Sequence, residues 1–197
     1  MNEKDAECSS KTRRIIYLTT LFVVGLAAIC LLGCAKGKEQ KGRPARVAGA
    51  CEIYDKLPKD IEKHVDVNYG GKAKLLGITA NKVSSNKLKI SYFWQIIEDP
   101  GAYNIVFVHV TDKENKPLFQ NDHDFCGNRS FKELKGKFIK EPYVVDIPPS
   151  ATGKDSYIKI GIYAPDLEGT PRLKIESPGG LPTDDGKTRA IVQEIKL

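Results

Sequence analysis

The sequence has few of the residues, and none of the spacings, on which several common kinds of site depend. Its 197 residues include five cysteines, three histidines and one tryptophan. No Cys-x-x-Cys pair occurs, which argues against a dithiol redox centre, and no zinc-type spacing is present. Neither Gly-x-Ser-x-Gly nor His-Glu-x-x-His occurs, so two common hydrolase signatures are missing. We therefore predict no catalytic residues, no metal site and no cofactor.

An excess of one charge is also nearly absent from the part of the chain expected to fold. The whole chain carries a formal charge of +6, but residues 34–50 hold five basic residues against one acidic residue. From residue 51 onward, 22 basic residues face 21 acidic ones. A nucleic-acid-binding domain carries its positive excess on the folded face, so we exclude nucleic acid as a partner. The basic stretch is either a solvated linker or a segment attracted to anionic lipid.

One long apolar run lies near the start of the chain. Residues 15–34 contain no charge and follow Lys11, Arg13 and Arg14. A basic segment, an apolar run and small residues at its end form the layout of an export signal. The run is also about as long as a membrane span requires, so an uncleaved transmembrane anchor is the alternative.

The apolar run ends in Leu-Leu-Gly-Cys34, which resembles the lipobox of bacterial lipoproteins. The resemblance implies that residues 1–33 are a signal peptide and that Cys34 becomes the acylated first residue. Fatty acyl chains such as palmitate hold a protein on a membrane by burying methylene groups, at about 0.8 kcal/mol each. The next residue is Ala and not the Asp that retains such lipoproteins in the inner membrane of Gram-negative bacteria. This implies a lipid-anchored protein of the outer membrane that faces the periplasm.

Two further cysteines, Cys51 and Cys126, remain after the predicted lipidation site. Two thiols in an oxidising compartment are more often paired than free. We therefore predict a disulfide that closes a loop of about 75 residues and stabilises the fold by roughly 4 kcal/mol on the chain-entropy estimate. Two separate thiols are the alternative.

The composition and the hydrophobic period divide the mature chain into three parts. Residues 34–50 are rich in Gly, Lys, Ala and Arg and are predicted to be a disordered linker. Residues 51–71 are predicted to be an irregular lead-in, with one helical turn at 60–65 as an alternative. Residues 72–197 follow a period of two between turn signals, which predicts a β-sandwich domain.

The β-sandwich is expected to be antiparallel and immunoglobulin-like, with seven to eight strands. The clearest alternation places Leu88, Ile90, Tyr92, Trp94 and Ile96 on one face of a strand. Neither a repeat nor a long helical pattern occurs after residue 34. The predicted strands are 74–79, 87–97, 103–111, 117–121, 138–147, 156–163, 172–176 and 189–197.

The middle of the chain, from Lys74 to Ile175, resembles a known module. The matching stretches are Leu75–Ile78, Leu88–Trp94, Tyr103–Val110, Gln120–Asp122, Tyr143–Pro148, Ile160–Tyr163 and Pro171–Leu173. Their order is similar to a β-sandwich at the extracytoplasmic end of some bacterial membrane glycosyltransferases of the dolichyl-phosphate-mannose transferase type. Phe93 departs from that pattern, and the transferase's catalytic membrane part is absent. The resemblance therefore implies fold and compartment, without transferase activity.

Five residues are candidates for binding a ligand. His109 and Asp122 lie on neighbouring predicted strands and can face each other across a hairpin, either as a ligand pair or as a structural hydrogen bond. Asp122, His123 and Asp124 offer oxygen and nitrogen ligands, although a solvated turn that ends at the disulfide is the favoured interpretation. Trp94 belongs to a group of aromatic residues that would either form a sugar-stacking platform or lie in the core. The group consists of Tyr92, Phe93, Trp94, Tyr103 and Phe107.

These patterns together predict a membrane-anchored bacterial lipoprotein of the cell envelope. The acylated Cys34 binds membrane lipid, and the β-sandwich is a non-catalytic binding or assembly module with an envelope protein or glycan as its partner. The alternative is an envelope enzyme, or a carbohydrate-binding accessory protein, that acts on cell-surface glycans. In an enzyme, titratable groups such as His109, Asp122, His123, Asp124 or Glu141 should converge in a pocket.

Overall fold

Strands form most of the structure. The computed structural model describes residues 47–48 and 51–197, so Cys34, the predicted signal peptide and most of the predicted linker lie outside the described residues. All described residues belong to one compact unit, Pro44–Leu197. The strands of the larger sheet are β1 (Val47–Ala48), β2 (Glu52–Tyr54), β3 (Lys63–Tyr69), β4 (Ala73–Ser84), β5 (Lys87–Ile96), β9 (Phe138–Asp146) and β11 (Ile175–Ser177). The strands of the smaller sheet are β6 (Ile105–Thr111), β7 (Pro117–Gln120), β8 (His123–Asp124), β10 (Asp155–Tyr163) and β12 (Ala190–Lys196).

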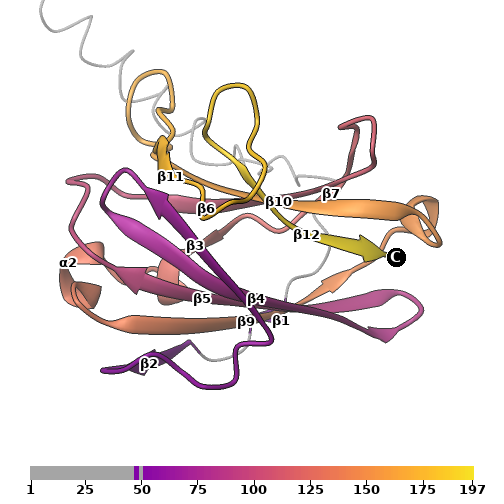
Figure 1. Ribbon diagram of the computed structural model, residues 1–197, viewed down its shortest axis with the longest axis horizontal. Coiled ribbons are helices and arrows are strands. Elements are labelled where there is room, and N and C mark those ends of the chain that lie inside the picture. Colours follow the sequence, from indigo (N-terminus) through magenta and orange to yellow (C-terminus); the bar gives the residue numbers. More distant parts are fainter. Residues whose placement is uncertain (1–46, 49–50) are drawn as a thin grey trace, which may run out of the picture. The chain divides into compact units, whose positions relative to one another are not determined.

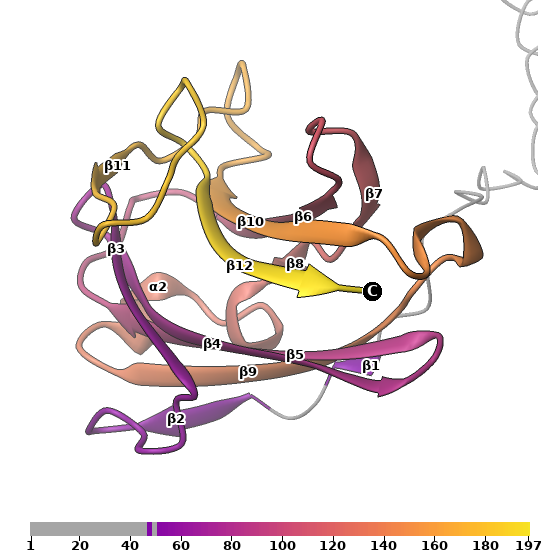
Figure 2. The same ribbon diagram turned by 45° about the vertical axis from the view of Figure 1, so that its right-hand side comes forward.

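The two antiparallel sheets stack into a sandwich (Figures 1 and 2). The larger sheet has the order β1-β9-β5-β4-β3-β11, with β2 also paired to β9, and the smaller has the order β12-β10-β6-β7, with β8 also paired to β6. The chain crosses from β5 to β6, returns as β9 beside β5, and crosses again to β10 beside β6. This connectivity is that of an immunoglobulin-like sandwich, in which the strands lettered B and E pair in one sheet and C and F pair in the other. Here β5 and β9 are the first of these pairs, and β6 and β10 are the second. The predicted all-β class is confirmed.

The core lies between the sheets because each central strand alternates its side chains. Leu88, Ile90, Tyr92, Trp94 and Ile96 of β5 are all fully buried. They face the even-numbered valines of β6 and isoleucines of β10, which are also fully buried. This apolar interior supplies most of the buried surface that holds the two sheets together.

The lead-in predicted for residues 51–71 is wrong, because it contains two strands of the larger sheet. Strand β3 pairs with β4, and β2 pairs with the end of β9. Val67 and Tyr69 point into the core, and the Tyr69 hydroxyl donates a hydrogen bond of 2.9 Å to the Ile160 carbonyl of the opposite sheet. Strand β1 also lies within the predicted disordered linker and pairs with β9.

The outer face of the larger sheet carries a small apolar cluster of its own. Phe93 is paired with Gly77 across the β4–β5 ladder and is almost completely buried. A Cβ at Gly77 would lie 2.2 Å from Ile61 Cγ2, so only glycine leaves room for Ile61. The Lys140 ammonium lies 5.8 Å from the Phe93 ring centroid. Residues before β3 thus cover a face that strand alternation alone would leave in solvent.

The segment between the predicted strands 117–121 and 138–147 is more than a connecting loop. It contains β8, a 3-10 helix η2 (Phe125–Gly127) and a short helix α2 (Phe131–Leu134). The Ser130 side chain accepts a hydrogen bond from the Glu133 backbone N–H at the start of α2, which is the usual role of an N-cap. Phe131 and Leu134 are buried in the core cluster, and α2 lies at one end of the sandwich between the layers (Figure 2).

Candidate functional site

The candidate residues around Asp122 lie on two opposite faces of the smaller sheet. The chain from Gln120 to Asp124 is extended, and its side chains therefore alternate. Asn121 and His123 point inward and are buried, whereas Gln120 is exposed and Asp122 and Asp124 are partly exposed. The solvated turn predicted for these residues is wrong for this reason. Within the described residues, no three His, Cys, Asp or Glu side chains are grouped to hold a metal ion.

His109 and Asp122 lie on the outer face, where they line the same hollow of about 270 Å³. His109 is paired in register with Gln120, at the last position of β7, and Asp122 follows two residues later. The two side chains are not within ion-pair distance of each other. The other residues that line the hollow are Phe107, Gln120, Tyr163, Thr170 and Arg172.

The floor of the hollow is an aromatic ring laid over a glycine. Phe107 is paired with Gly161, and a Cβ at Gly161 would lie 2.2 Å from Phe107 Cζ and 2.4 Å from the Thr188 carbonyl oxygen. Phe107 is only 3% exposed, because the Arg172 guanidinium lies 5.0 Å from its ring centroid. Arg172 is therefore held in place by a cation–π contact while it remains exposed to solvent.

His109 is held as a neutral imidazole by its two neighbours. Its Nδ1 lies 3.3 Å from Arg189 Nη1, and arginine can only donate, so Nδ1 accepts. The proton is then on Nε2, which lies 2.9 Å from the Gln120 amide nitrogen. The amide satisfies this proton when its oxygen faces the ring. Burial lowers the pKa of His109; nearby Asp122 opposes this, and Arg189 and other cations add to the lowering.

The lowered pKa predicts that His109 makes the fold less stable in acid. Below about pH 6.5 an unfolded histidine gains a proton, whereas folded His109 stays neutral until a lower pH, so the unfolded state binds more protons. The free energy of unfolding should therefore fall as the pH decreases through about 6.5. Because His109 is only half-buried, we expect the unfolding free energy to change with pH by much less than the one-proton value of about 1.4 kcal/mol per pH unit.

This pH dependence can be measured by urea unfolding of wild type and His109→Gln between pH 5 and pH 8. The variant should lose less stability in acid than wild type. His64→Gln, at an exposed position of β3, is the matched control. An unchanged pH slope in His109→Gln would contradict the neutral, Arg189-bound state of His109.

Asp122 has a structural contact in addition to its place in the hollow. Its Oδ1 accepts a hydrogen bond of 3.1 Å from the Val108 backbone N–H, and the Asn121 backbone N–H donates to the Val108 carbonyl at 2.9 Å. The Asp122 carboxylate thus replaces a ladder acceptor where β7 ends and the chain turns toward β8. The same contact fixes where the carboxylate sits at the rim of the hollow.

Arg189 is positioned by the turn before β12. Asp184 accepts hydrogen bonds from the backbone N–H groups of Thr188 and Arg189, and its Oδ2 lies 2.9 Å from Arg189 Nε. Burial raises the pKa of Asp184, but these hydrogen bonds outweigh burial, and the net pKa is lowered. The turn therefore holds Asp184 as a carboxylate and directs Arg189 toward His109.

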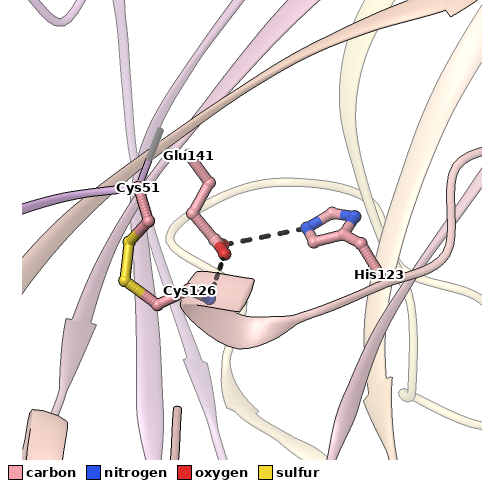
Figure 3. Close-up of a disulfide and its surroundings, with 4 residues drawn as sticks. All are labelled: Cys51, His123, Cys126 and Glu141. Carbon is pink, nitrogen blue, oxygen red and sulfur yellow. Dashed lines mark hydrogen bonds and ion pairs between the residues drawn. A yellow bond between two sulfur atoms is a disulfide. The ribbon is translucent and has the colours of Figure 1, made fainter. Parts of the chain in front are cut away.

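The inward-facing residues form a buried polar cluster beside the disulfide (Figure 3). The predicted disulfide between Cys51 and Cys126 is present. Glu141 lies between it and His123: Oε1 accepts a hydrogen bond of 2.6 Å from the Cys126 backbone N–H, and Oε2 is 3.7 Å from His123 Nε2. The His123 Nδ1 lies 2.7 Å from the Asn121 carbonyl oxygen, to which it can only donate. Both Glu141 and His123 are buried, so substrate has no access to this pair.

Aromatic side chains enclose His123, and one of them, Tyr92, belongs to the group considered for a stacking platform. The His123 ring centroid is 5.0 Å from that of Tyr92 and 4.2 Å from that of Tyr143. Asn121 donates a hydrogen bond of 3.0 Å to the Tyr92 hydroxyl. Trp94 is fully buried and lies 5.2 Å from Phe125, ring centroid to ring centroid. These rings are core residues, and Trp94 is therefore not accessible to a ligand.

Asp124 and Tyr103 lie at one end of the sandwich. Tyr103 is 40% exposed, and its hydroxyl donates a hydrogen bond to the Asp124 carboxylate. Burial, followed by the hydrogen bond to Asp124, raises the pKa of Tyr103 to about 12. Tyr103 and Phe125 line a second hollow of about 390 Å³, between the β5–β6 loop and the segment that contains η2. Of the aromatic residues considered for stacking, only Tyr103 is substantially exposed within the described chain.

Comparisons with known proteins give no further assignment. No protein-family model matches the chain, and no curated protein and no solved structure matches it either. The resemblance to a glycosyltransferase-associated module therefore stays a prediction. Among residues 47–48 and 51–197, no helix is both long enough and apolar enough to cross a bilayer. The predicted apolar span and Cys34 lie outside these residues.

Proposed function

We propose that this chain is a lipid-anchored, non-catalytic binding module of the bacterial cell envelope. In this proposal Cys34 carries the acyl chains, and the sandwich presents the outer face of its smaller sheet to an envelope partner. The anchor is supported by the lipobox-like end of the apolar run. A disulfide in the folded part supports an oxidising compartment outside the cytoplasm. An outer-membrane location, facing the periplasm, is supported by the residue after Cys34.

The observation that carries the binding role is the state of the charges in the outer hollow. Arg172 and Asp122 both line it, and neither has an ion-pair partner within 4 Å among the described residues. Charged groups that are not in ion pairs, beside an aromatic floor, are suited to binding a polar ligand.

The same hollow argues for binding over catalysis. A general base needs a free lone pair within reach of the substrate, and both ring nitrogens of His109 already have partners. Asp122 is tied to the Val108 N–H. The other close pair of titratable groups, His123 and Glu141, is buried between the sheets.

The anchor is tested by the intact mass of the protein purified from the membranes of its native host. We expect the mass of residues 34–197 plus acyl chains, with a gain of two hydrogens on reduction. An uncleaved and unacylated mass would instead identify residues 15–34 as a transmembrane anchor. That result would remove the lipoprotein proposal and leave the binding surface to be tested separately.

The binding surface is tested by site-specific photo-crosslinking in intact cells. A photo-reactive residue at Thr170, an exposed position of the hollow, should crosslink to an envelope component. The same residue at Glu114, exposed in the turn between β6 and β7, is the matched control and should give no such product. Equal crosslinking at both positions, or none at Thr170, would contradict the proposed surface.

A further inference from the structure

The charged residues around the outer hollow divide into those already bonded to other side chains and those that line the hollow itself. Arg189 is paired with Asp184 at 2.9 Å. The Lys159 ammonium donates to the Asn115 side-chain oxygen. Arg172 and Asp122 are the two charged residues that line the hollow itself, and neither is in an ion pair within the described chain. The hollow therefore offers one cationic and one anionic group to whatever occupies it.

The two charged groups bind different kinds of chemical group. The guanidinium of Arg172 is a planar fork of donors that matches a carboxylate with two parallel hydrogen bonds. The carboxylate of Asp122 accepts hydrogen bonds, and hydroxyl groups are suitable donors for it. When the Gln120 amide is turned so that its oxygen accepts from His109, its N–H donors are left for a ligand oxygen. A ligand with a carboxylate at one end and hydroxyls at the other satisfies all three residues.

The field in the hollow favours a ligand with net negative charge. The pair of Arg189 with Asp184 is neutral, which leaves Arg172 and Lys159 as the cations near the hollow against the single carboxylate of Asp122. Nearby cations also lower the pKa of His109, although burial is the larger cause. A zwitterion such as a free amino acid would neutralise Asp122 with its ammonium group and leave this positive excess unmatched. A small inorganic anion would bring its charge close to Asp122 without offering that carboxylate enough donors.

The size and walls of the hollow limit the ligand to one small ring. Its volume of about 270 Å³ is below the usual range for drug-sized ligands, which starts at about 300 Å³. The Tyr163 ring meets Phe107 edge to face, with centroids 5.7 Å apart, and provides an apolar wall. Sugar rings carry apolar C–H faces that aromatic side chains cover.

We infer that the outer hollow binds a single acidic sugar unit of the hexuronate class. In this arrangement Arg172 binds the sugar carboxylate, and Asp122 and Gln120 bind its hydroxyls. The inference rests on the proposed function, because it names the ligand of the same surface. It makes the envelope partner an acidic polysaccharide in place of a protein.

The test is a set of ligand-observed NMR titrations of the full, lipidated protein in detergent micelles at pH 7. The probes are glucuronate, glucose, acetate and alanine, which separate the complete ligand from its hydroxyls, its carboxylate and a zwitterion. We expect glucuronate to bind at least ten times more tightly than each of the other three.

Three variants locate the binding. Arg172→Gln should weaken glucuronate binding at least tenfold, because it removes the charged guanidinium and its two parallel hydrogen bonds to the carboxylate. Asp122→Asn should weaken it severalfold while its Oδ1 still accepts from the Val108 N–H, so the fold is kept. Lys113→Gln, in the exposed turn between β6 and β7, removes the same charge as Arg172→Gln outside the hollow and should have no effect.

Four results would overturn the inference. Equal affinity for glucose would remove the acidic specificity, and equal affinity for acetate would remove the sugar. Tighter binding of alanine would identify an amino-acid site. Glucuronate binding that survives Arg172→Gln, or no glucuronate binding at all, would rule out this site for acidic sugars. In each case the Thr170 crosslink reports separately on whether the surface binds a partner.

Discussion

Replacing both Cys51 and Cys126 with serine should lower the free energy of unfolding by about 4 kcal/mol. The disulfide joins residues 75 apart in the sequence, and the chain-entropy model assigns about that much to a loop of this length. The bond also joins the two layers, because Cys51 precedes β2 at the edge of the larger sheet and Cys126 follows β8 of the smaller one. A loss of this size is a large part of the stability of an ordinary domain.

The measurement is urea unfolding of wild type and the double variant, each with and without reductant. Reductant should destabilise wild type by about the same amount as the two substitutions. It should have no effect on the Cys51→Ser/Cys126→Ser variant, which therefore serves as its own control. Equal unfolding midpoints for oxidised wild type and the double variant would mean that the bond contributes nothing to the folded state.

Replacing Glu141 with alanine should cost about 3–5 kcal/mol, because it removes a buried hydrogen-bond acceptor and leaves a cavity. Glu141 is the acceptor of the Cys126 N–H, and it is the carboxylate that faces His123 inside the sandwich. Its removal leaves a buried N–H without that acceptor, leaves His123 Nε2 without its neighbour and opens a cavity.

Two further variants separate these contributions. Glu141→Gln keeps an oxygen that can accept from the Cys126 N–H and should cost clearly less than Glu141→Ala. Glu114→Ala removes a carboxylate from an exposed turn and should stay within about 0.5 kcal/mol of wild type. Denaturant unfolding under oxidising conditions gives all three values. A Glu141→Ala protein as stable as Glu114→Ala would show that the buried carboxylate does not stabilise the fold.

The strands that the sequence predicts are those with a sustained period of two. All eight predicted strands are present, and the longer ones have several apolar residues on one side that must be buried. Strand β3 was missed although Val65, Val67 and Tyr69 alternate with polar residues, because the charged segment before it also fits one helical turn. Strands β1, β2 and β8 have only two or three residues, which is too short for any period to be detected.

The alternation of the sequence already indicates where the buried polar cluster lies. Glu141 has the same parity as Ile139, Tyr143 and Val145, so the alternation already places it on the inner face of β9. His123 shares its parity with Asn121 in the same way. A charged residue on the apolar side of a predicted strand indicates a buried polar pair. The predicted disulfide at Cys126 lies next to this pair.

The outer hollow was only half predictable. His109 and Asp122 belong to neighbouring strands, and hairpin geometry brings such residues to one face. Arg172 and Arg189 come from connections before and after β11, and their positions depend on how those connections fold back over the sheet. No local pattern determines this, so the cation that gives the site its chemistry appears only in the structure.

The position of the disulfide also determines how the domain carries mechanical load. Tension that arrives along the chain from its N-terminal side divides at Cys51, where one branch is the peptide chain and the other is the covalent link to Cys126. The link is the shorter path, so residues 52–125 form a closed ring that is not stretched. That ring contains strands β2 to β8 and the connections between them, and therefore also His109 and Asp122 of the outer hollow. A domain tethered at this end would keep these strands in register while it is pulled.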